Sequence, residues 1–86
     1  MVTLQELDKK FFPVHNESGF KIVTKHGFTP TTTGGYGLVR KNIFVKSNIE
    51  LHLCVGVSGD YFIVYKDGIE CKRGWTSALE SYLMNL

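Results

Sequence analysis

The stretch VRKNIFVKSNIELHLCVGVSGDYFIVYKDGIEC, residues 39–71, decides the fold. Apolar residues alternate with polar ones along it, and three short turns interrupt the alternation. Counted through those turns, one set of residues shares a single parity: Val39, Ile43, Val45, Ile49, Leu51, Leu53, Val55, Phe62, Val64, Ile69 and Cys71. A period of two is typical of strands with one buried face. The stretch therefore predicts an antiparallel meander with one apolar face.

Turn signals divide this stretch into strands. Asp67-Gly68 is the strongest of them, because both central positions of a type I′ turn need positive φ. Ser58-Gly59 indicates another tight turn, and Lys46-Ser47-Asn48 indicates a three-residue turn. The strands expected between these turns cover residues 38–45, 49–57, 60–66 and 69–73.

Counting cross-strand pairs outward from the turns gives a register. It sets Ile43 opposite Leu51, Val55 opposite Phe62 and His52 opposite Tyr65. The apolar residues then agree on one face, which supports the register. Lys41 is the exception, since this count points it into the core, and we expect a bulge or a sheet edge beside it.

Helices are predicted at both ends of the chain. Thr3 and Glu6 have capping-box spacing, which predicts a helix over about residues 3–12 that Pro13 ends. Ser77 and Glu80 have the same spacing, which predicts a last helix from Ser77 to the end of the chain. The expected buried stripe of that helix is Leu79, Tyr82, Leu83 and Leu86. Trp75, just before it, is expected to be a hydrophobic staple or a core residue.

The segment between the first helix and the meander is less regular. Residues 15–19 are expected to form a loop, and residues 20–25 a strand with Phe20 and Ile22 on one face. Residues 26–37 contain four glycines, a proline and three consecutive threonines, which favour a long loop over a helix or a continuous strand. The expected fold class is therefore α+β: a four- or five-stranded antiparallel meander flanked by an N-terminal and a C-terminal helix.

Composition limits the class of protein. The chain has 86 residues, 43% of them hydrophobic and 21% charged, which predicts one ordered domain over residues 1–86. A net charge of +2 does not by itself identify a nucleic-acid binder. No apolar run approaches the roughly 18 residues of a membrane span, and the N-terminus lacks signal-peptide features. The expectation is a soluble, cytoplasmic protein whose cysteines, Cys54 and Cys71, are free thiols.

The second face of the meander is where a binding function is expected. Its register places aromatic, cationic and amide side chains together, and the Thr/Gly loop of residues 31–37 is expected to assist as a recognition loop that carries Tyr36. The candidate partner-binding residues are Tyr36, Arg40, Phe44, Tyr61, Tyr65 and Lys72. Such a face suits a protein interface, because tyrosine and arginine are frequent in binding hot spots. It equally suits stacking of unpaired bases. The alternative is that these aromatics pack against the N-terminal helix.

Catalytic and metal motifs do not emerge from the sequence. His52 and Cys54 lie on one strand face, but side chains two residues apart are about 6.5 Å from each other, too far for a direct hydrogen bond. A structural zinc site needs four converging ligands, which the three histidines and two cysteines do not offer by spacing. Residues 31–37 lack the Lys-Ser/Thr of a P-loop. The protein is therefore expected not to be an enzyme and to hold no metal or cofactor.

In general character the chain resembles small single-domain proteins encoded by bacteriophages and other mobile elements, among them anti-CRISPR proteins and inhibitors of host toxins. The resemblance rests on one short α+β domain, the hairpin Val64–Gly68, a capped final helix and the lack of a catalytic set. It implies an inhibitor or adaptor that binds and blocks a host protein in the host cytoplasm. It carries no diagnostic motif, so it assigns no residue a role. The alternatives are a small RNA or single-stranded DNA binder, and a homodimer that buries this face against its own copy.

Overall fold

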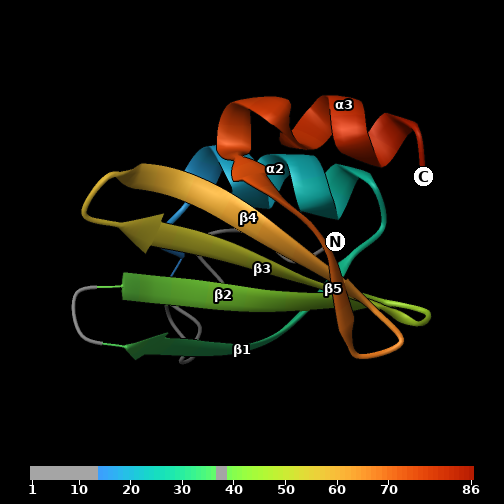
Figure 1. Ribbon diagram of the computed structural model, residues 1–86, viewed down its shortest axis with the longest axis horizontal. Coiled ribbons are helices and arrows are strands. Elements are labelled where there is room, and N and C mark those ends of the chain that lie inside the picture. The colour runs from blue at the N-terminus through green and yellow to red at the C-terminus, as the bar shows by residue number, and fades with distance from the viewer. Residues whose placement is uncertain (1–13, 37–38) are drawn as a thin grey trace.

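The computed structural model describes residues 14–36 and 39–86, which form two short helices, a 3₁₀ turn and a five-stranded sheet. Each strand pairs antiparallel with the next along the chain, so the sheet is a meander, and both helices lie together on one side of it (Figure 1). In chain order the elements are α2 (Glu17–Lys25), β1 (Thr29–Tyr36), β2 (Val39–Lys46), β3 (Ile49–Gly56), β4 (Gly59–Lys66), β5 (Ile69–Trp75), η1 (Thr76–Ala78) and α3 (Leu79–Met84). The α+β class and the antiparallel meander are confirmed. The expected helix over residues 3–12 lies outside the described residues.

The region expected to be a loop and a first strand is helix α2 instead. The Asn16 side chain caps it by accepting a hydrogen bond from the Gly19 backbone N–H at 3.0 Å. Phe20 and Val23, three residues apart, are buried against the sheet. Gly27 follows the last turn of the helix with a φ of 87°, and glycine adopts such a positive φ without strain. These signals outweigh the alternation of Phe20 with its neighbours, so the strand prediction is wrong.

The segment expected to be a long loop is in large part the edge strand β1. Its pairing with β2 shifts between Pro30 and Thr32, so Thr31 forms a bulge. The Thr31 hydroxyl donates a hydrogen bond to the Ile43 carbonyl at 2.9 Å. Proline and glycine are tolerated in this strand because an edge strand needs hydrogen bonds along one side only.

The β2–β3 turn has two residues rather than three, and this changes which face of β2 is buried. Ser47 takes a φ of 55°, and Lys46 pairs with Ile49. Phe44 therefore lies opposite Leu51, where the sequence count had put Ile43. A shift of one residue turns a strand over. Phe44 thus faces the helices, Lys41 faces away from them, and the expected bulge at Lys41 is not needed.

The two later turns preserve the predicted faces. The β3–β4 turn lies at Val57-Ser58, one residue earlier than expected, and the register shifts by two. An even shift leaves every side chain on the same face. The Asp67-Gly68 turn is confirmed, with φ values of 53° and 81°. An irregularity at Cys71, between the Tyr65–Glu70 and Val64–Lys72 pairs, then moves the rest of β5 by one residue and turns it over relative to the prediction.

The hydrophobic core fills the space between the helices and the near side of the sheet, here called the helix face. Its buried members are Phe20, Val23, Phe28, Phe44, Leu51, Leu53, Phe62, Val64, Leu79 and Leu83. Leu86, expected in the buried stripe of the last helix, is exposed, because α3 ends at Met84.

Polar contacts join the two ends of the described chain. The buried Asn16 amide donates to the Thr76 hydroxyl at 2.8 Å, across 60 residues of sequence. Glu80 of α3 accepts from Lys25 of α2 at 2.9 Å and lies 2.8 Å from the ring of His26, the residue that follows α2. The helices are therefore held to each other as well as to the sheet.

Candidate protein-binding cleft

The face of the sheet turned away from α2 and α3, here called the second face, is organised as rows of side chains that cross the strands. Cross-strand partners share a face, so the register defines each row. The first row is Lys41, Cys54, Tyr61 and Trp75, the second is Ile43, His52, Ile63 and Arg73, and the third is Val45, Glu50, Tyr65 and Glu70. This face therefore carries three aromatic side chains, a histidine and two cations among its described members.

Of the five candidate residues from the sequence whose side chains the structure describes, it brings together two. Tyr61 and Tyr65 lie on the second face in neighbouring rows, as expected. Phe44 is 0% exposed on the helix face and cannot contact a partner. Arg40 and Lys72 also belong to the helix side, opposite Val55 and Val64 respectively. Tyr36 ends β1, where it pairs with Val39.

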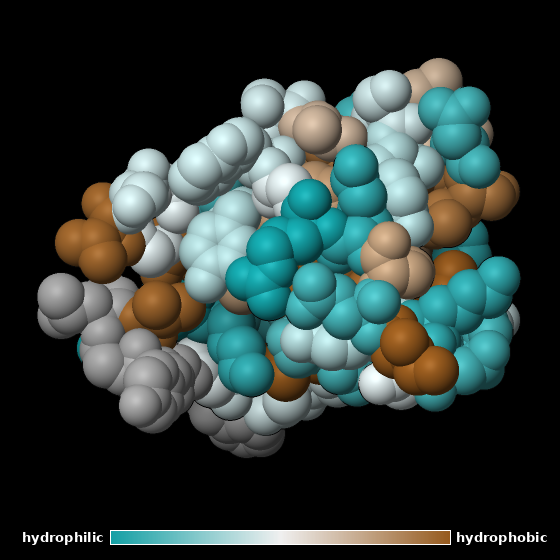
Figure 2. All heavy atoms as spheres, in the orientation of Figure 1, coloured by the Kyte–Doolittle hydropathy of each residue, from teal (hydrophilic) through white to brown (hydrophobic). Residues whose placement is uncertain are grey.

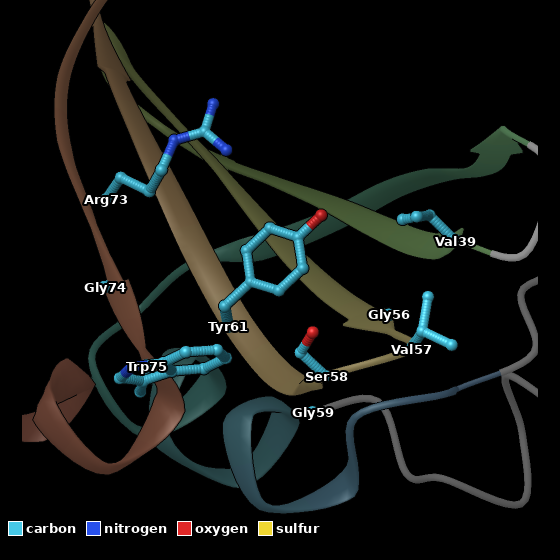
Figure 3. A pocket seen from close by; sticks show the side chains of 9 residues that line it. All are labelled: Val39, Gly56, Val57, Ser58, Gly59, Tyr61, Arg73, Gly74 and Trp75. Carbon is cyan, nitrogen blue, oxygen red and sulfur yellow. The ribbon is translucent and has the colours of Figure 1, made fainter.

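A cleft of about 480 Å³ occupies the end of the second face next to the β3–β4 turn. Its described lining residues are Val39, Gly56, Val57, Ser58, Gly59, Tyr61, Arg73, Gly74 and Trp75. The Tyr61 ring stands in the middle, with Arg73 and Trp75 on one side and Val39 and Val57 on the other (Figure 3). In the space-filling view, hydrophobic atoms are visible at both ends of the sheet, one of which carries the β3–β4 turn (Figure 2).

Two apolar side chains of this cleft are unusually exposed. The exposed fraction is 84% for Val57 and 56% for Trp75, although Trp75 was expected to be a staple or core residue. Trp75 is directed outward because it pairs with Tyr61 on the second face, whereas the core lies on the other side. Val57 is exposed in the turn between β3 and β4. Scattered apolar residues are ordinary on a protein surface, but apolar residues grouped around a hollow mark an interaction site.

Arg73 supplies the positive charge of the cleft. Its guanidinium donates to both carboxylate oxygens of Glu70, at 3.0 and 3.4 Å. This hydrogen bonding holds the pKa of the Glu70 carboxyl below its ordinary value, while Glu70 raises the pKa of Arg73. Both side chains are substantially exposed, so the pair is a weak one.

The middle of the second face contains three buried side chains, those of Cys54, His52 and Ile63. Burial raises the pKa of the Cys54 thiol, which therefore stays protonated and a poor nucleophile at neutral pH. Burial likewise raises the pKa of Tyr61. His52 is held by Glu50, 2.6 Å from its ring nitrogen, and its ring packs 4.8 Å from that of Tyr65. Glu50, His52 and Tyr65 therefore form a contact cluster on this face.

Sequence reasoning missed Arg73, Trp75 and Val57 as members of the site. The register of β5 was counted without the irregularity at Cys71, so Lys72 was placed on the second face instead of Arg73. Val57 was assigned to a strand, yet it begins the β3–β4 turn. An apolar residue in a tight turn between two glycines, Gly56 and Gly59, was the available signal that it projects outward.

Within residues 14–36 and 39–86, no three His, Cys, Asp or Glu side chains gather in a way that could hold a metal ion. In those same ranges, no helix has both the length and the apolar character to cross a membrane. Comparison with known protein families, with curated proteins and with solved structures found no match to this chain.

Proposed function

We propose that this protein is a non-enzymatic binding module, an inhibitor or adaptor that acts by docking a partner protein on the second face of its sheet. The observation that carries the proposal is the cleft around Tyr61, where Trp75 and Val57 expose apolar surface beside Arg73. Aromatic residues and arginine are the side chains most enriched in binding hot spots. A host protein is the partner that the resemblance to phage-encoded inhibitors suggests.

The fold supports this function because the residues of the hydrophobic core and the residues of the cleft lie on opposite faces of the sheet. The core is built on the helix face, from residues that alternate with those of the second face. Trp75 and Val57 therefore contribute little to the core, and their exposure is not needed for folding. A surface with this composition is consistent with a blocking interface that needs no chemistry of its own.

The test is a capture experiment from bacterial lysate with matched variants. We expect the immobilised protein to retain a partner protein that survives nuclease treatment and that is lost by Trp75→Ala. Lys72→Ala is the control, since Lys72 lies on the helix side of the same strand. Retention by all three forms, or loss on nuclease treatment, contradicts the proposal.

A second candidate function, binding of single-stranded nucleic acid, rests on the neighbouring rings of Tyr61 and Tyr65 with Lys41 and Arg73 on the same face. Bases stack on such rings while cations neutralise phosphates. Its signature is ionic strength, because the affinity for a labelled oligonucleotide must fall steeply as salt rises. An aromatic-centred protein interface depends much less on salt.

A further inference from the structure

The cleft around Tyr61 combines apolar walls with one cation, and this combination defines what can fill it. Val57 and Trp75 are its exposed apolar members. Among the described residues that line it, Arg73 is the only charged one. A partner segment that enters the cleft must therefore bring apolar surface, and negative charge beside that surface is favoured.

The two carboxylates nearest to Arg73 in the fold differ in their relation to this charge: the register directs Asp60 away from it, whereas Glu70 is paired with it. Asp60 precedes Tyr61 in β4 and pairs with Val55, so its side chain belongs to the helix side. Glu70 shares the second face and is hydrogen-bonded to Arg73. Because exposed ion pairs contribute little free energy, a partner carboxylate can replace Glu70 at small cost.

We propose that the cleft binds a bulky apolar side chain of a partner protein that has an Asp or Glu next to it in sequence. The apolar side chain packs between Trp75 and Val57, against the Tyr61 ring. The neighbouring carboxylate takes the place of Glu70 on the Arg73 guanidinium. The proposal rests on the protein-binding function above and specifies which segment of a partner is recognised.

The experiment uses three capped hexapeptides and the full chain. The first peptide is Gly-Ser-Asp-Phe-Ser-Gly, the second has Asn for Asp, and the third has Ala for Phe. Binding is followed by NMR through the indole N–H of Trp75, which is unambiguous because the chain contains one tryptophan. At low salt we expect the Asp-Phe peptide to bind about threefold more tightly than its Asn counterpart. The Ala peptide should bind about tenfold more weakly or worse, since the apolar burial is lost.

Variants then assign the charge preference to one side chain. Arg73→Gln should bind the Asp and Asn peptides equally, whereas Lys72→Gln, a neighbouring cation on the helix side, should keep the preference. Glu70→Gln should raise the affinity for the Asp peptide about twofold, because it removes the competing carboxylate. Unfolding midpoints equal to that of the wild-type chain show that each variant is folded.

Three results overturn the proposal: equal binding of the Asp and Asn peptides, an Asp preference that survives in Arg73→Gln, or no change at the Trp75 indole. Their meaning differs from failure of the broader function. If these results occur while Trp75→Ala still loses a nuclease-resistant partner, the protein-binding function stands and the recognised chemistry is wrong. If capture also fails, both are wrong.

Discussion

Replacing Asn16 with alanine should remove a large part of the stability of this chain. The side chain is completely buried, and both its oxygen and its amide nitrogen make hydrogen bonds. Its oxygen accepts from the Gly19 N–H at 3.0 Å, and its amide donates to the Thr76 hydroxyl at 2.8 Å. Loss of a helix cap costs about 1 kcal/mol. A buried hydroxyl left without its partner costs about 1 to 3 kcal/mol more.

The sum, about 2 to 4 kcal/mol, is a substantial share of the roughly 5 to 10 kcal/mol expected for a domain of this size. In urea, with an m-value of about 1 kcal/mol/M, the midpoint of Asn16→Ala should fall by about 2 M or more. Asn85→Ala is the control, because the Asn85 side chain bonds Ser81 on the exposed surface. That change should cost less than about 0.5 kcal/mol.

A double-mutant cycle isolates the contact between the two ends of the chain. Thr76→Val alone should cost about 1 to 2 kcal/mol, because the Asn16 amide then lacks its acceptor. In the Asn16→Ala background the same change should cost close to nothing, giving a coupling of about 1 kcal/mol or more. Additive costs, or a single Asn16→Ala cost under about 0.5 kcal/mol, would refute this account of the contact.

Other features of the structure lead to further measurable expectations. Phe44→Ala should destabilise the chain by about 3 to 5 kcal/mol in urea unfolding, because the ring is fully buried in the core. Cys71 is exposed and should react with a thiol reagent in the folded protein. Cys54 is buried and has a raised pKa, so it should react only as fast as the chain opens. Mass spectrometry of partially labelled protein distinguishes the two cysteines. The hydrogen bond from Lys25 holds the pKa of Glu80 below its ordinary value of 4.5. That carboxyl binds fewer protons folded than unfolded, so its stabilising contribution is present above pH 4.5 and is lost as pH falls through the folded pKa. Glu80→Gln should therefore flatten the acid limb of stability measured against pH.

The Asp67-Gly68 turn was the part of the meander that the sequence predicted best. Asp67-Gly68 fixed the β4–β5 hairpin because few other sequences adopt two positive φ values. The Ser47-Asn48 turn was harder, since only Ser47 takes a positive φ there and its flanking residues do not reveal the loop length. A three-residue turn directs Lys41 into the core, and a lysine there is the sequence signal that this turn length is wrong and that β2 has the opposite orientation.

Helix α2 was missed because two periodicities coexist in one short segment. Alternation of Phe20, Ile22 and Thr24 favours a strand, while the spacing of Phe20 and Val23 favours a helix. The Asn16 cap and Gly27 decide in favour of the helix once both are considered. The cleft could not be found from sequence, because Arg73 reaches the second face only through the irregularity in β5.

The meander topology has a consequence for how the chain reaches its native state. Every pair of neighbouring strands is also consecutive in sequence, so the sheet can grow hairpin by hairpin with short loop closures. The Asn16–Thr76 contact spans 60 residues, and because closing so long a loop is costly we expect it to form after the strands between its two residues. Weakening it should therefore speed unfolding and leave the folding rate nearly unchanged. The Asn16–Thr76 contact is therefore expected to slow unfolding of a sheet whose strand pairs form between neighbours in sequence.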